Sequence, residues 1–185
     1  MPIGEFRLGP NAADNGIIEE GYYGKLVGES FNIPTRYGGV CGPGSFCTAG
    51  IRADCVAGTY CEYELMSTNT DLCDAGYYCE AGTLRRRPTE LSSHKGAMCL
   101  PQQFCVQGSS AGADCPVGTY SDARGLQASA QCSPCKNGFY CETPGLDKAT
   151  MLTQLCYAGK YCLTGTSSSS AAPDCDFGKY CPLGS

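Results

Sequence analysis

The stretch that decides the fold, residues 115–141, reads Cys115-Pro-Val-Gly-Thr-Tyr120, then runs through Gly125 to Cys132-Ser-Pro-Cys135-Lys-Asn-Gly-Phe-Tyr140-Cys141. It holds two copies of one template: a cysteine, two variable residues, a glycine, one variable residue, an aromatic residue and usually a second cysteine. Such short units at repeated intervals indicate a tandem array, because each unit is too small to bury a core alone.

The template fits eight copies, numbered 1 to 8 in chain order, which begin near residues 41, 55, 73, 99, 115, 135, 156 and 175. A ninth, degenerate copy at residues 18–24 keeps the glycine and the aromatics but has neither cysteine. The fourth position is glycine in every copy except copy 4, where it is Gln102. Glycine favours a positive φ or a close backbone approach. We therefore expect each copy to form a short strand, a turn at the glycine and a second short strand.

The sixth position of the template is aromatic in all nine copies. If successive copies stack, these rings form a continuous spine in which each ring covers a disulfide and the glycine of the next copy. A ladder of aromatic side chains that binds a ligand is the alternative interpretation. The residues are Tyr23, Phe46, Tyr60, Tyr78, Phe104, Tyr120, Tyr140, Tyr161 and Tyr180.

Cysteine is abundant and large apolar side chains are scarce. The 185 residues include 16 Cys, 6 Phe and no Trp, and the apolar residues form no long periodic runs. Cross-links are therefore expected to replace a single large core. An even number of regularly spaced cysteines is typical of proteins that fold in an oxidising compartment. We expect an extracellular or cell-surface protein that has passed through the secretory pathway, although residues 1–10 lack the apolar stretch of a signal peptide.

Two pairings of the cysteines are possible. In the first, each copy closes on itself, and Cys115, whose copy carries Ser121 at the seventh position, pairs with the extra Cys132. We prefer this pairing because the missing second cysteine of copy 5 then explains the presence of the extra Cys132. Its bonds are Cys41–Cys47, Cys55–Cys61, Cys73–Cys79, Cys99–Cys105, Cys115–Cys132, Cys135–Cys141, Cys156–Cys162 and Cys175–Cys181.

In the second pairing, the last cysteine of each copy bonds to the first cysteine of the next, as in Cys47 with Cys55. This arrangement leaves Cys41 and Cys181 for neighbours outside the chain. It also requires a tight bridge within residues 132–135.

Several classes of function lack the residues that they need. A formal net charge of -5 disfavours nucleic acid as a partner, and no segment has the roughly 18 apolar residues of a membrane helix. The single histidine, His94, has no matching nucleophile or carboxylate motif. The spacing of Cys132 and Cys135 suits zinc, but no second pair accompanies it. We predict no enzyme activity, no cofactor and no metal.

Two surface features are candidates for partner contact or modification. The polar insertion at residues 80–98 contains Arg85, Arg86 and Arg87, which form the one dense positive cluster and either contact a partner or are simply solvated. No Asn-x-Ser/Thr sequence occurs, but a Ser/Thr-rich connector is either a linker or a carrier of O-linked glycans. The candidate positions in this connector are Thr164, Thr166, Ser167, Ser168, Ser169 and Ser170.

Residues 115–141, which begin with Cys-Pro-Val-Gly-Thr-Tyr-Ser and continue through a Gly-containing loop to a Cys-x-x-Cys spacer, resemble the ephrin-receptor-like cysteine-rich repeat. They are also similar to the first half of a tumour-necrosis-factor-receptor cysteine-rich module, where the corresponding pairing implies Cys115 with Cys132. The likeness is weaker for residues 41–105 and 156–181 and absent for residues 1–17. Tandem arrays of this form resemble those of large secreted and surface proteins of protists and algae. The resemblance implies an extracellular, β-rich disulfide rod but no single function, since such repeats serve as spacers, adhesins and receptor stalks.

Together these observations predict a small disulfide-rich, all-β fold: an elongated, solenoid-like tandem array of short β-hairpin repeats with little helix. Residues 1–40 are expected to form an extended N-terminal arm, and residues 41–185 the repeats. The first functional hypothesis is an extracellular structural protein that polymerises through its arm and repeat ends into a filament, a mastigoneme-like flagellar hair or a surface coat. A receptor or adhesin that binds a ligand through residues 80–98 is the alternative, and a disulfide-rich protease inhibitor is a third possibility.

Overall fold

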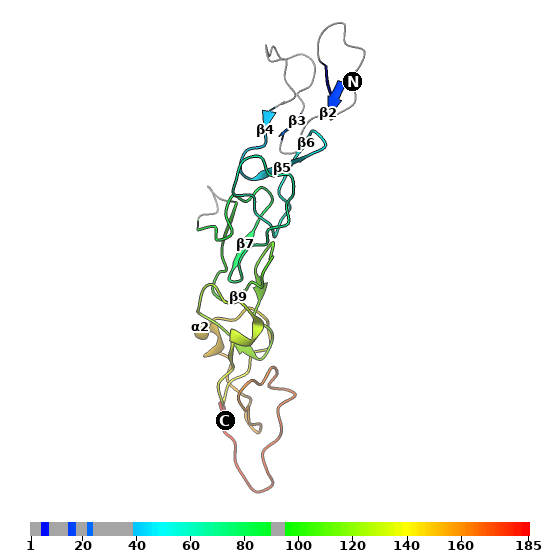
Figure 1. The fold of residues 1–185 in the computed structure, drawn as a ribbon. Coiled ribbons are helices and arrows are strands. Elements are labelled where there is room, and N and C mark those ends of the chain that lie inside the picture. Colours follow the sequence, from blue (N-terminus) through cyan, green and yellow to red (C-terminus); the bar gives the residue numbers. More distant parts are fainter. Residues whose placement is uncertain (1–4, 8–14, 18–21, 24–38, 90–94) are drawn as a thin grey trace. The chain divides into compact units, whose positions relative to one another are not determined.

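The computed structural model describes residues 5–7, 15–17, 22–23, 39–89 and 95–185, and its regular elements are short (Figure 1). Every sheet in this part of the chain has two strands. The helices are a 3-10 turn, η1 (Ser129–Gln131), and a single turn of α-helix, α2 (Lys148–Met151). The strands are β1 (Glu5–Arg7), β2 (Asn15–Ile17), β3 (Tyr22–Tyr23), β4 (Gly39–Val40), β5 (Ser45–Thr48), β6 (Ile51–Asp54), β7 (Tyr77–Cys79), β8 (Gly96–Met98), β9 (Gln103–Phe104), β10 (Ala113–Asp114), β11 (Thr119–Tyr120) and β12 (Ser133–Pro134).

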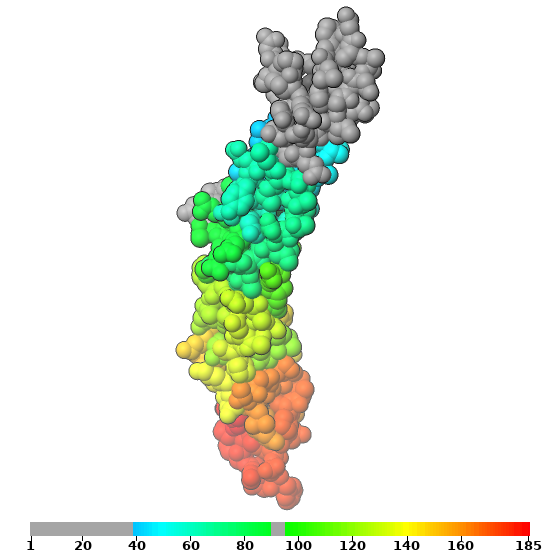
Figure 2. All heavy atoms as spheres, in the orientation of Figure 1, coloured from blue at the N-terminus to red at the C-terminus, as the bar shows by residue number. Residues whose placement is uncertain are grey.

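The chain divides into two compact units. Unit 1 comprises Met1–Cys73 and Cys79–Ala97, and unit 2 comprises Asp74–Tyr78 and Met98–Ser185. Within unit 2 the copies follow one another in sequence order, as the progression of colours in Figure 2 shows. The predicted class is therefore correct: a disulfide-rich tandem array of short antiparallel β-hairpins with almost no helix.

The hairpins, however, are not built as the sequence suggested. The strand that carries the aromatic residue pairs with the segment just before the first cysteine of the next copy, so the loop of the hairpin lies in the connector. The template glycine lies in a separate turn, as predicted: in copy 5 the N–H of Thr119 donates to the carbonyl oxygen of Pro116 (3.1 Å). In copy 5, Thr119 pairs with Pro134 and Tyr120 with Ser133, and Pro134 directly precedes Cys135. In copies 1 to 8 the expected strand before the glycine does not form. In seven of the eight copies the disulfide closes the seven-residue loop, and only the aromatic strand pairs, with the connector.

The same register recurs along the array. The residue at the fifth position of a copy pairs with the residue before the next copy's first cysteine, for example Ser45 with Asp54 in the sheet of β5 and β6. The degenerate copy follows this rule too, since Tyr22 pairs with Val40, the residue before Cys41. Its backbone is thus paired like that of the other copies although it lacks cysteine.

The interior consists mostly of cystine. Fourteen of the cysteines are buried, with exposed fractions of 0–5%, and apolar side chains add small clusters around them. In one cluster, Leu146 and Met151 lie against the bonded pair Cys135 and Cys141. Every described helix is too short to cross a membrane.

Candidate assembly surface

The template glycine joins each copy to the next. In copy 5 the N–H of Gly118 donates to the carbonyl oxygen of Cys141 (2.8 Å), and its own carbonyl accepts from the N–H of Cys135 (2.8 Å). Both cysteines belong to copy 6. Gly118 has a φ of 81°, which turns both polar groups of the residue toward the neighbouring copy. The predicted positive φ of the template glycine is therefore confirmed, with an inter-copy role that its position alone did not reveal.

A second glycine, which the template did not include, completes the junction. The N–H of Gly145 donates to the carbonyl of Cys115 (2.9 Å), and the carbonyl of Leu146 accepts from the N–H of Ser121 (2.9 Å). Copy 5 is thus tied to copy 6 by four backbone hydrogen bonds. All four form between copies 1 and 2, 2 and 3, 5 and 6, 6 and 7, and 7 and 8.

We call the four groups that a copy offers to its successor its trailing face: the first-cysteine carbonyl, the glycine N–H and carbonyl, and the seventh-position N–H. The matching groups of the successor are its leading face: the first-cysteine N–H, the seventh-position carbonyl, the second-glycine N–H and the next carbonyl. Each face combines two donors with two acceptors, so only the correct register satisfies all four groups.

The second glycine was visible in the sequence. It follows the seventh position by three or four residues and has positive φ throughout, with Leu65 as the one substitute at φ 63°. The sequence interpretation missed it because the template ended at the second cysteine. The glycines are Gly50, Gly82, Gly108, Gly125, Gly145, Gly165 and Gly184.

In copies 1, 3, 5 and 6 the template glycine also lies against the second glycine of the copy two places on. A Cβ atom added at Gly118 would lie 2.6 Å from the carbonyl oxygen of Gly165, the second glycine of copy 7. Gly44 and Gly76 stand in the same relation to Gly82 and Gly125, again at 2.6 Å. Only a residue without a side chain fits such an approach.

Copy 4 replaces this contact with a side-chain bond. Gln102 takes the glycine conformation, with φ 73°, and its Nε2 donates to a carboxylate oxygen of Asp147 at 3.3 Å. Asp147 follows the second glycine of copy 6, so Gln102 still reaches the copy two places on. Asp147 also caps α2, and the hydrogen bond from the Thr150 N–H (2.6 Å) lowers the pKa of its carboxyl group.

The eight disulfides are those of the self-closing pairing, including the exceptional bond between Cys115 and Cys132. No cysteine is free. Successive copies are consequently joined by backbone hydrogen bonds and packing, and by no disulfide.

In copies 5 and 6 the aromatic residue of the template packs on the following copy's cystine. Tyr120 contacts the cluster around Cys135 and Cys141, and Tyr140 contacts the cluster around the cystine of copy 7. These rings are half-buried, whereas Tyr180 in copy 8 is 86% exposed. The side chain of Tyr23 lies outside the described residues.

One ring contact was not foreseen. The rings of Tyr140 and Tyr157 meet edge to face with centroids 5.7 Å apart. The side-chain hydrogen bond between Tyr140 and Tyr157 raises the pKa of the Tyr140 hydroxyl, and desolvation by burial raises it further. Tyr157 stands at the second position of copy 7, outside the predicted spine.

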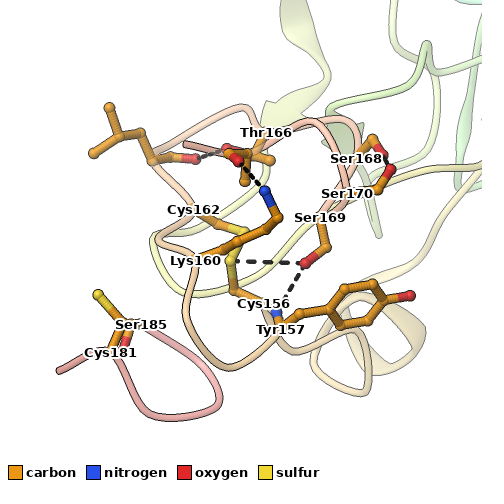
Figure 3. The surroundings of a disulfide bond; sticks show 12 residues. Cys156, Tyr157, Lys160, Cys162, Thr166, Ser168, Ser169, Ser170, Cys181 and Ser185 are labelled. Atoms are coloured by element: carbon orange, nitrogen blue, oxygen red, sulfur yellow. Dashed lines mark hydrogen bonds between the residues drawn. A yellow bond between two sulfur atoms is a disulfide. The ribbon is translucent and has the colours of Figure 1, made fainter. Parts of the chain in front are cut away.

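The O-glycosylation candidates differ in accessibility. Ser169 is 1% exposed, and its Oγ accepts from the N–H of Tyr157 at 2.8 Å beside the sulfur of Cys156 (Figure 3). A sugar at Ser169 would break this packing, so the inclusion of Ser169 among the candidates was wrong. Thr164, Ser167 and Ser170 are exposed, and Thr166 and Ser168 are half-buried.

The arginine cluster stands on a loop with a closed base. Arg85, Arg86 and Arg87 are exposed, while Pro88 and Thr83 are fully buried. The Thr83 hydroxyl donates to the carbonyls of Glu80 and Lys95 and holds the two ends of the loop together. His94 lies outside the described residues.

Copy 8 carries the one trailing face without a described successor. The N–H and carbonyl of Gly178, the carbonyl of Cys175 and the N–H of Cys181 form no hydrogen bond with any residue that the structure describes. Within the same part of the chain, no group of three or more His, Cys, Asp or Glu side chains is placed to hold a metal. No protein-family model matches the chain, and no curated protein sequence matches it.

Proposed function

We propose that this protein is an extracellular structural protein, a subunit of a filament, of a mastigoneme-like flagellar hair or of a surface coat. The observation that supports this proposal is the repeated junction, in which the same four backbone hydrogen bonds join successive copies at five of the seven junctions. A chain made of repeats that bind one another suits a structural protein, since each added repeat increases both the stability and the length of the chain. Eight disulfides are typical of proteins that work in an oxidising environment.

Electron microscopy of native, non-reduced protein over a wide range of protein concentration tests the proposal. We expect regular fibres or sheets whose amount grows with concentration. Deleting residues 1–40 should abolish them, because the arm is the proposed second contact. Separate particles at every concentration would contradict the structural role.

A second candidate is a receptor or adhesin ectodomain that binds an acidic ligand through the 80–98 insertion. The observation in its favour is the exposure of Arg85, Arg86 and Arg87 on a loop whose base is fixed by Thr83. Guanidinium groups bind carboxylates and sulfates with two parallel hydrogen bonds.

The two candidates respond differently to the same substitutions. Changing Arg85, Arg86 and Arg87 together to Ser should abolish retention on a heparin column if the loop is a binding site, and should leave assembly unchanged. The matched control replaces the exposed Lys136, Lys148 and Lys179 with Ser, which removes the same charge elsewhere. Equal retention of the two triple variants would exclude the loop as a specific site.

A further inference from the structure

The junction of copies 6 and 7 brings two tyrosine side chains into contact. Tyr140, the template aromatic residue of copy 6, directly precedes Cys141, and Tyr157 of copy 7 directly follows Cys156. The ring centroids are 5.7 Å apart and the ring planes meet at 69°. Both residues belong to unit 2. No disulfide joins these two copies, because Cys141 and Cys156 each bond within their own copy.

The two rings approach each other at their hydroxyl ends. A side-chain hydrogen bond joins Tyr140 to Tyr157, and the hydroxyl is the only hydrogen-bonding group of a tyrosine side chain. The carbon atoms ortho to the two hydroxyls therefore lie at the near edges of the rings. In a phenoxyl radical these ortho carbons carry much of the unpaired spin, and two such radicals join through them.

The pair is also accessible to an oxidant. Tyr157 is 50% exposed, so it can lose an electron to an oxidant in solution. Tyr140 is half-buried and packs on the cystine of copy 7, which fixes its ring beside that of Tyr157. The ring contact then allows Tyr140 to pass an electron to the Tyr157 radical, after which Tyr157 is oxidised again.

The sequence builds such a pair at one junction. The second position of a copy is aromatic only in copy 7, where it is Tyr157. At the preceding junction, Tyr120 of copy 5 is the equivalent of Tyr140, and the second position of copy 6 is Lys136. The array therefore contains its own control, a template tyrosine that packs on the next cystine but has no tyrosine at the second position of the next copy.

We propose that Tyr140 and Tyr157 form a site of oxidative cross-linking, which a haem peroxidase with hydrogen peroxide converts into dityrosine. Each phenol loses one electron and one proton, and the two radicals form one carbon–carbon bond between ortho carbons. The hydrogen on each of these carbons then moves to the phenolic oxygen and restores the two hydroxyl groups. Hydrogen peroxide takes up the two electrons and two protons and becomes two molecules of water. The product links copy 6 covalently to copy 7, whether or not the protein forms filaments.

Peptide mapping tests the site. The folded, disulfide-bonded full-length chain is treated at low protein concentration with a haem peroxidase and hydrogen peroxide, and is then reduced, alkylated and digested with trypsin. Tyr140 and Tyr157 fall in separate tryptic peptides, residues 137–148 and 149–160. We expect one linked species that is lighter than the two peptides together by two hydrogen atoms and has the fluorescence of dityrosine. Recovery of the two peptides only in separate form, under conditions that couple free tyrosine, would overturn the proposal.

A matched pair of variants identifies the residues. Tyr157→Phe keeps the ring but removes the hydroxyl, and should abolish the linked species. Tyr120→Phe makes the same change at a half-buried template tyrosine that packs on the next cystine, and should leave the linked species unchanged. If Tyr157→Phe gives as much dityrosine as the unchanged chain, other tyrosines are responsible and the proposal is wrong.

Protein concentration and unfolding distinguish a built contact from chance encounters. The yield of the link between Tyr140 and Tyr157 should be independent of protein concentration, whereas coupling between chains through an exposed residue such as Tyr63 (70%) should rise with it. In the reduced, unfolded chain the coupling should spread over the 12 tyrosines. A link between peptides 137–148 and 149–160 that forms only between two chains, or equally well after unfolding, would contradict the proposed site.

Discussion

The template glycine shows how one residue type determines the repeat. At Gly118 the φ of 81° aims the N–H and the carbonyl at copy 6, and the missing side chain admits the carbonyl of Gly165 from copy 7. Gly118 of copy 5 therefore contacts both copy 6 and copy 7. Gly165 separates the need for a positive φ from the need for a missing side chain. Its φ is 83°, but a Cβ atom added there would meet only the Cβ atom of Pro134, at 4.0 Å.

Gly118→Ala should destabilise the protein more than Gly165→Ala does. Both substitutions force alanine into the left-handed region at a cost of about 1–2 kcal/mol, but only Gly118→Ala also overpacks a carbonyl, which adds about 1–3 kcal/mol. Differential scanning calorimetry of the two oxidised variants measures the difference. Equal melting temperatures would show that the contact between copies two places apart contributes nothing.

Asp147 gives a residue-scale prediction for pH. Its pKa is lowered from the usual 3.8 because the folded carboxylate accepts the N–H of Thr150 at 2.6 Å. The stabilisation is therefore complete above pH 3.8 and is lost as pH falls from there through the lower, folded-state pKa. Thr150 amide exchange, corrected for its intrinsic pH dependence, should become faster across this acidic window.

Asp147→Asn is the matched variant for that experiment. A neutral amide caps a helix about as well as a carboxylate, so the Thr150 amide of Asp147→Asn should show no change across the same pH window. A pH-dependent loss of protection in the asparagine variant would assign the effect to another group.

At the level of elements, the buried Thr83 hydroxyl bonds to both Glu80 and Lys95 and so joins two segments that are distant in sequence. Thr83→Val should leave the carbonyls of Glu80 and Lys95 without their hydroxyl donor, at a cost of about 1–3 kcal/mol. The Glu80 N–H, which donates to Lys95 at 2.7 Å, should then exchange faster, whereas Thr83→Ser keeps the hydroxyl and should retain protection. Unchanged exchange in Thr83→Val would mean that the strands alone close the loop.

The strands, turns and disulfides also show how much of the fold can be predicted from the sequence. Local regularity predicted the array, the positive-φ glycine and a self-closing set of disulfides that matches those found, because a seven-residue loop closes without regard to its surroundings. The strand partners were not predictable in this way, since they lie beyond connectors whose repeat spacing varies between 14 residues (Cys41 to Cys55) and 26 residues (Cys73 to Cys99). The ring contact of Tyr140 with Tyr157 forms between copies, and Ser169 is buried where the connector of copy 7 folds back onto Tyr157 and Cys156. A template of seven consecutive residues describes neither contact.

On the scale of the whole molecule, the pairing predicts that one cut separates the chain. No disulfide connects residues before Arg85 with residues after Arg87. A specific protease site inserted between Arg85 and Arg86 should therefore give two fragments on a denaturing gel without reductant. The pairing of neighbouring copies would instead hold the fragments together through Cys79 and Cys99.

A control insertion places the same site between Ala123 and Arg124, inside the loop closed by Cys115 and Cys132. Both residues are exposed, so cleavage should be equally efficient. These fragments should separate only after reduction, which excludes incomplete cutting as the reason for a single band.

The order in which the disulfides are reduced should follow the burial of their cysteines. Cys175 and Cys181 are the only cysteines that are not buried. A thiolate must reach a sulfur atom to exchange with it. Limited reductant followed by alkylation and peptide mass mapping should therefore label Cys175 and Cys181 first, and the fourteen buried cysteines later. Simultaneous labelling of all copies would mean that the array unfolds as one cooperative unit, and early labelling of copies 5 or 6 would show that burial does not control access.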